Sequence, residues 1–178
     1  MRSLRPVLSL AVRWRYVVLF AVAGAFFWPA YRANGASHPT GDWLFFKVGA
    51  FVLTRRLPGS SESPLRLYVD NPALQIGPPP LLLVAIGQRL SSPAVATAVL
   101  AIAMALAGPA AVGLLEATAR RLGDRSDYGR LALITLGGGL VVAATWGQAA
   151  GSWRHLDDVM ALLAVAGAML ACARGRSA

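Results

Sequence analysis

The segment SWRHLDDVM (152–160) places a histidine beside two adjacent carboxylates, directly before an apolar run. An imidazole and carboxylates this close together can transfer protons or bind a divalent cation. On a helix beginning near residue 155, His155 and Asp158 are three positions apart and share a face, whereas Asp157 points elsewhere. Both aspartates would equally suit a capped helix start, so the group alone does not define a function.

Asp42 is a second acidic position with the same ambiguity. It precedes a short apolar helix predicted over 43–54, where the backbone amide dipoles favour a carboxylate. That carboxylate can serve as an N-cap or as a general base. Cationic side chains on and after this helix can hold a phosphate or anchor the chain at anionic lipid. They are Lys47, Arg55, Arg56 and Arg66.

The amino-acid composition indicates whether these residues belong to a soluble or a membrane protein. Of 178 residues, 56% are hydrophobic and 14% charged, and the mean hydropathy is +0.56, outside the range of soluble domains. The net charge is +9, but the basic residues form short clusters between apolar runs, a pattern typical of membrane topology rather than of nucleic-acid binding. We therefore expect an integral membrane protein with no nucleic-acid partner. The single cysteine, Cys172, excludes an intrachain disulfide and is predicted to be a small core residue.

Four uncharged windows approach or exceed the roughly 20 apolar residues that cross a bilayer. We predict an all-α polytopic membrane protein in which residues 1–178 form one transmembrane domain. The first span is expected to be an uncleaved anchor, because its apolar run ends in bulky Trp28 and Tyr31 rather than in small residues. The predicted spans are 16–31, 93–116, 131–152 and 158–173.

Two further apolar stretches are too short to span. In NPALQIGPPPLLLVAIGQ (71–88), prolines crowd the first half, and proline is tolerated only in the first turn of a helix. We expect a helix over about 79–89, lying in or dipping into the membrane interface, as we do for the helix over 43–54. Both interfacial helices belong to the long segment 32–92.

The distribution of arginine predicts the orientation, since basic residues concentrate in cytoplasmic segments. We predict a multi-pass protein of the plasma membrane with both termini cytoplasmic. Segment 32–92 and the short SWRHLDD loop then face outward, so Asp42 and the group around His155 could line one cleft. The arginine-dense segments are 1–15, 119–130 and 174–178.

The order of several motifs is informative. An anchor helix is followed by GDWLFF, by LYVDNPALQIGPPPLLL leading a short helix, by a long span ending in EATARRLG, and by an outer HLDD. This order resembles the N-terminal part of the polytopic C-type glycosyltransferases, closest to the family 87 mannosyltransferases that use polyprenyl-phosphate-mannose. The resemblance implies that Asp42 is the catalytic base. It also implies that His155, Asp157 and Asp158 form a second acidic motif, and that Tyr68 and Asn71 belong to the lead into the interfacial helix.

The implied reaction is an inverting transfer of a sugar from a lipid phosphate to a cell-envelope acceptor. Such a donor requires no nucleotide-binding fold and no glycine-rich phosphate loop, and the sequence contains neither. The implied partners are membrane lipid, the polyprenyl-phosphate sugar donor and a second membrane subunit. We expect no cofactor and no metal, although His155 and the two aspartates are ligand types that a divalent cation accepts.

The resemblance covers nearly all of this chain but only the first part of a full enzyme, which carries more spans. The chain can therefore be a fragment, a degenerate copy or one subunit. The alternative function is a small non-catalytic accessory subunit. Its glycine-rich faces, Gly137 to Gly139 and the surface around Gly167, would pack against a larger membrane complex, or equally against one another.

Overall fold

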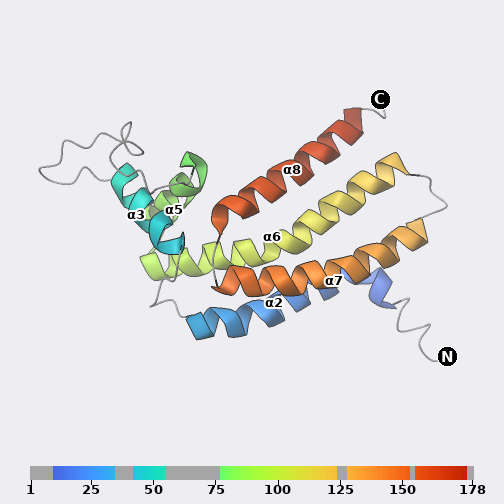
Figure 1. Ribbon diagram of the computed structural model, residues 1–178, viewed down its shortest axis with the longest axis horizontal. Coiled ribbons are helices and arrows are strands. Elements are labelled where there is room, and N and C mark those ends of the chain that lie inside the picture. Colours follow the sequence, from blue (N-terminus) through green and yellow to red (C-terminus); the bar gives the residue numbers. More distant parts are fainter. Residues whose placement is uncertain (1–9, 35–41, 55–76, 124–127, 153–154, 176–178) are drawn as a thin grey trace, which may run out of the picture.

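In the computed structural model of the chain, all described regular elements are helices (Figure 1). Four of them are long and apolar enough to cross a membrane, which confirms the predicted all-α polytopic class. They are α2 (Arg15–Asn34), α6 (Pro93–Leu122), α7 (Tyr128–Ser152) and α8 (Leu156–Gly175). The described residues are 10–34, 42–54, 77–123, 128–152 and 155–175.

Helices α3 (Asp42–Thr54) and α5 (Pro78–Leu90) have 13 residues each, too few to cross a bilayer. The first turn of α5 is formed by prolines, which cost no intrahelical hydrogen bond there. The two helices pack together through an apolar core that includes Phe46 and Leu81. Both lie at the end of the bundle where α6 and α8 begin (Figure 1).

Helices α2 and α7 pack with their backbones in direct contact. The face of α7 toward α2 carries a small residue at every fourth position: Gly139, Ala143, Gly147 and Gly151. A Cβ atom added at Gly151 would lie 2.7 Å from the carbonyl oxygen of Phe27, and one at Gly147 would overlap the carbonyl of Ala23. Small residues allow this close approach, which strengthens helix association in a membrane.

Helix α6 is longer than the span predicted from the sequence, because it continues through Glu116 to Leu122. Its start is capped by Ser92, whose hydroxyl accepts a hydrogen bond from the backbone N–H of Val95 at 3.3 Å. Its 30 residues extend over about 45 Å, beyond the ~30 Å hydrocarbon core. At least one end of α6 therefore extends beyond the hydrocarbon core of a bilayer.

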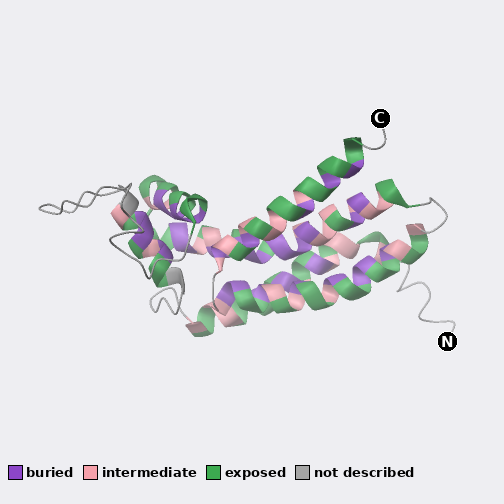
Figure 2. Cartoon of the chain, turned by 45° about the horizontal axis from the view of Figure 1, so that its top comes forward, coloured by how far each residue is buried: buried purple, intermediate pink, exposed green. Residues whose placement is uncertain are grey.

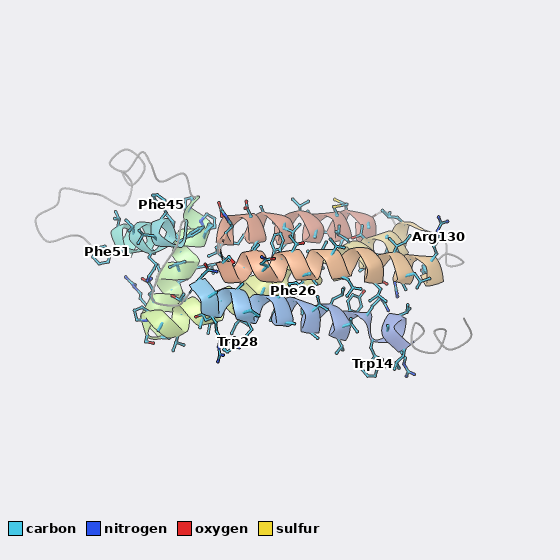
Figure 3. All side chains as sticks on the ribbon, turned by 60° about the horizontal axis from the view of Figure 1, so that its bottom comes forward. Trp14, Phe26, Trp28, Phe45, Phe51 and Arg130 are labelled. Atoms are coloured by element: carbon cyan, nitrogen blue, oxygen red, sulfur yellow. The ribbon has the colours of Figure 1, made fainter. Side chains whose placement is uncertain are left out.

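Large apolar side chains cover much of the outside of the molecule, as expected for a surface in contact with lipid. Phe26 and Trp28 on α2 and Phe45 and Phe51 on α3 are exposed (Figure 3). Trp14 and Trp28 are exposed near opposite ends of α2, the positions that membrane proteins give to interfacial tryptophans (Figure 3).

Helix α8 packs mainly on α6, and exposed residues occupy much of its surface (Figure 2). Cys172 lies on that exposed surface, so its prediction as a core residue is wrong. The sequence shows that Cys172 is in an apolar helix, but it does not show that α8 buries only the side that faces α6 and α5.

Candidate functional site

The start of α8 is anchored by two buried apolar residues, Leu156 and Val159, which join the same core as α3 and α5. The residues between and before them are polar. His155 precedes the helix, and Asp157 and Asp158 occupy its first turn, where carboxylates are favoured by the helix dipole. Anchoring by the apolar pair therefore fixes the group at this end of the bundle.

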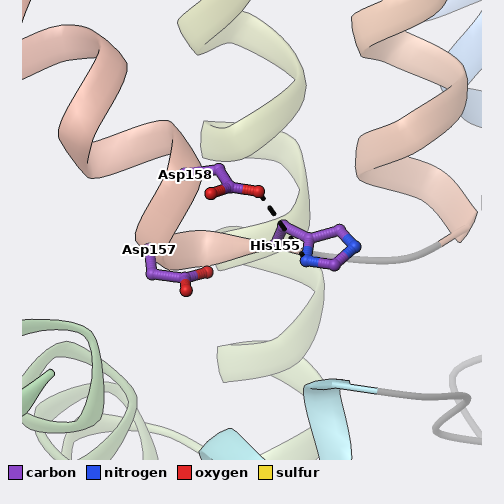
Figure 4. Close-up of side chains that lie close together, drawn as sticks. All are labelled: His155, Asp157 and Asp158. Carbon is purple, nitrogen blue, oxygen red and sulfur yellow. Dashed lines mark ion pairs between the residues drawn. The ribbon is translucent and has the colours of Figure 1, made fainter. Parts of the chain in front are cut away.

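His155, Asp157 and Asp158 come together in space (Figure 4). His155 Nδ1 lies 3.8 Å from Asp158 Oδ2, which agrees with the predicted shared face. Asp157 also belongs to the group, because one ligand atom from each of the three residues lies within 4.8 Å of the others. The sequence placed Asp157 on another side of the helix, but one of its carboxylate oxygens still lies within 4.8 Å of the ligand atoms of the other two residues.

The three side chains differ in what surrounds them. The side chain of Asp158 is 71% exposed and that of His155 is 34% exposed. By contrast, Asp157 Oδ1 is buried and receives no hydrogen bond from the described residues. A buried carboxylate oxygen without a donor is unfavourable, so a bound hydroxyl, water or cation would stabilise it. Of the residues described, this group offers the types of atom that a divalent cation prefers.

A pocket of about 270 Å³ opens beside this group, between α6, α7 and α8. His155 and Asp158 lie on its lining, and the remaining walls are apolar: Met104, Trp146, Ala149, Ala150 and Val159. The indole N–H of Trp146 donates a hydrogen bond to the backbone carbonyl of Met104 at 2.9 Å, which fixes the ring. An apolar pocket with a few polar groups is the common form of a small-ligand site.

Gly108 makes the position of Trp146 possible. A Cβ atom at residue 108 would lie 2.7 Å from Cγ of Trp146, so only glycine lets the indole pack this closely on α6. Sequence reasoning missed Met104, Gly108 and Trp146. A glycine before a proline inside a span and a lone tryptophan in an apolar run were the available signals.

The other predicted site residues are only partly described. Helix α3 begins at Asp42, so this residue lies at the same end of the bundle as His155, but its side chain is not among those described. Lys47 lies on α3 and is partly buried. The remaining predicted substrate-binding residues lie outside the described part of the chain: Arg55, Arg56, Arg66, Tyr68 and Asn71.

The opposite end of the bundle contains a charged cluster that the sequence did not predict. The side chain of Glu116 is fully buried, and Arg15 pairs with it through Nε at 2.8 Å and Nη2 at 2.7 Å. The hydroxyl of Tyr16 donates to the same carboxylate at 2.6 Å, and Arg120 forms an ion pair with it. The four-residue spacing of Glu116 and Arg120 was the local signal for part of this cluster.

No protein-family model, curated protein or solved structure matches this chain. The functional assignment therefore rests on the chemistry of the acidic end, defined by His155, Asp157 and Asp158, and on the pocket beside it.

Proposed function

We propose that this chain forms part of the transfer site of a membrane glycosyltransferase, which moves a hexosyl group from a polyprenyl-phosphate donor to a cell-envelope acceptor. Mannose is the sugar that the sequence resemblance favours. The supporting observation is the group of His155, Asp157 and Asp158 beside an apolar pocket, at the end of the bundle where the helix beginning at Asp42 also lies. A lipid-linked donor needs both a polar rim and an apolar wall.

The proposed reaction is a single displacement. The acceptor oxygen forms a bond to the anomeric carbon while the bond from that carbon to the phosphate oxygen breaks, and the phosphate leaves with the bonding electrons and remains on the lipid. A carboxylate takes the proton of the acceptor hydroxyl, a role that we assign to Asp42. His155 is placed on the pocket lining, where a protonated imidazole would stabilise the departing phosphate.

The remaining acidic-end residues have supporting roles in this proposal. Asp158 lies 3.8 Å from His155 and would orient its imidazole. The oxygen of Asp157 that has no donor among the described residues would accept a hydrogen bond from a sugar hydroxyl. Cationic and polar residues of the segment after Asp42 would complete the phosphate and sugar contacts. These are Lys47, Arg55, Arg56, Arg66, Tyr68 and Asn71.

A second candidate is a non-catalytic accessory subunit, and one observation favours it. A Cβ atom added at Gly137, Gly138 or Gly167 would meet nothing within 4 Å, so these glycine surfaces are open to another membrane helix. The same open surfaces suit a transferase site that a second membrane subunit completes. In both cases we propose a plasma-membrane location with cytoplasmic termini, because of the arginine bias.

The test is transfer of labelled mannose from polyprenyl-phosphate-mannose to membrane acceptors by vesicles that contain the full chain. Asp42→Asn is expected to lower the rate by about 100-fold, the usual contribution of a general base. Asp127→Asn is the matched control, since it makes the same chemical change in a segment predicted to lie across the membrane, and it should leave the rate unchanged. Equal rates for both variants would remove the base assignment, and absence of transfer by the wild type would favour the accessory subunit.

A further inference from the structure

The charged cluster at the α6 C-terminal end contains one carboxylate and two guanidinium groups among the described residues: Glu116 with Arg15 and Arg120. The pairing of Arg15 is complete. Its Nε and Nη2 bind both oxygens of Glu116, its Nη1 donates to the carbonyl of Val12 at 2.9 Å, and its side chain is 11% exposed. One arginine therefore already neutralises the buried carboxylate.

Arg120 is held differently. It reaches Glu116 through Nη2, its side chain is 38% exposed, and its buried Nε has no hydrogen-bond partner among the described residues. Tyr128 supports the guanidinium from α7, with its ring centroid 5.5 Å from Cζ, and its hydroxyl donates to the backbone carbonyl of Arg120 at 3.0 Å. Among the described residues, the second positive charge of the cluster is thus ordered, partly accessible and shares its carboxylate with Arg15.

The depth of Arg120 in a bilayer follows from its neighbours. It lies in the last turn of a helix that exceeds the hydrocarbon thickness. Tyr16 contacts the carboxylate of Glu116, and the ring of Tyr128 lies under the guanidinium of Arg120. Trp14 and Arg130 are exposed at the same end of the bundle (Figure 3). Aromatic residues of this kind mark the headgroup level, where lipid phosphates are the available anions.

We propose that Arg120 binds the phosphate of an anionic phospholipid at this end of the bundle. The guanidinium turns away from Glu116, which uncovers the buried Nε, and it exchanges its bond to Glu116 for a two-point pairing of phosphate oxygens through Nε and Nη2. Arg15 and Tyr16 keep Glu116 paired during this exchange, so no buried charge is left alone. Two-point pairing with an oxyanion is the strongest interaction of arginine, and it gives the unpaired Nε an acceptor. Basic pockets between membrane helices bind lipid headgroups in this way.

The test measures retained lipid on the full chain in nanodiscs by native mass spectrometry, comparing phosphatidylglycerol with phosphatidylcholine. Arg120→Lys keeps the positive charge but removes the paired Nε and Nη2 donors of the guanidinium. It is expected to weaken phosphatidylglycerol binding by about 10-fold. Arg121→Lys is the matched control, because Arg121 is the next residue of the same helix and is exposed. It should change binding by less than about 2-fold.

Three outcomes would overturn the proposal. Equal retention of the two lipids by the wild-type chain excludes an anion site, and this result depends on no variant. Equal losses in Arg120→Lys and Arg121→Lys indicate diffuse charge attraction instead of a built site. Displacement of phosphatidylglycerol by millimolar-range inorganic phosphate indicates a soluble anion as the ligand. None of these outcomes depends on sugar transfer, so the proposed function stands or fails separately.

Discussion

Buried carboxylate oxygens at the two ends of the bundle differ in the hydrogen-bond donors around them. At the α6 C-terminal end, Glu116 is fully buried and takes donors from Arg15, Tyr16 and Arg120. At the acidic end, Asp157 has a buried oxygen without a donor among the described residues, and Asp158 is mostly exposed and lies 3.8 Å from His155. A satisfied carboxylate holds helices together, whereas an unsatisfied one is available to a ligand.

This difference also separates a charge that joins two helices from the charges that we propose bind a ligand. Glu116 joins α2 to α6 across 101 residues of sequence, and a lone charge in its place would be strongly unfavourable. The acidic end is held by apolar contacts of Leu156 and Val159 instead. Substitution of the exposed Asp158 is therefore expected to leave the helices packed together.

The largest effect is expected from Glu116→Ala. The substitution leaves the poorly exposed Arg15 without its carboxylate, and breaking a buried pair on one side costs roughly 3–5 kcal/mol. Unfolding of the purified chain in mixed micelles with increasing denaturing detergent measures this loss. Glu116→Gln keeps the shape and should lose less than Glu116→Ala. A stability unchanged by either variant would show that the network does not join α2 to α6.

A smaller effect is expected from Gly108→Ala, which tests the pocket at the acidic end. The new methyl group would meet Trp146 at 2.7 Å, and overpacking of this kind costs about 1–3 kcal/mol unless the indole moves. Movement of the indole would change the pocket wall and lower sugar transfer, even with His155 intact. Tryptophan fluorescence and the transfer assay together distinguish a moved ring from a destabilised helix.

Gly113→Ala is the matched control on the same helix. Its methyl group would meet only a carbon of Tyr16 at 3.5 Å, an ordinary van der Waals contact near the other end. It should leave both fluorescence and transfer unchanged. If it lowers transfer as much as Gly108→Ala, the loss comes from the general properties of α6 and not from the pocket.

Much of the fold could be predicted because the bilayer penalises charge so strongly. Uncharged windows located all four membrane-length helices, and proline chemistry located the start of the short helix α5. The C-terminal end of α6 was missed because Glu116 looked like the end of a span. Its partner Arg15 lies on a different helix, and no local pattern connects the two residues.

The candidate site was predicted only as far as local spacing reaches. His155 and Asp158 were correctly placed near each other, since three positions separate them. The packing of Trp146 on Gly108 and Met104, which forms the pocket, depends on the contact between α6 and α7. Such contacts between distant segments are set by tertiary packing, which a single sequence does not display.

The smallest effect on stability is expected from Asp158→Asn, which compares the acidic end directly with the buried Glu116 at the other end. Asp158 is exposed and its contact with His155 is long, so the stability loss comes mainly from its helix-dipole interaction, about 0.3–1 kcal/mol. The stability loss should therefore be several times smaller than that of Glu116→Ala, while sugar transfer decreases because His155 loses its carboxylate partner. Detergent unfolding and the transfer assay on the same preparations measure both quantities. A large stability loss with normal transfer would make the acidic end a helix cap, and the two ends would then have the same structural role.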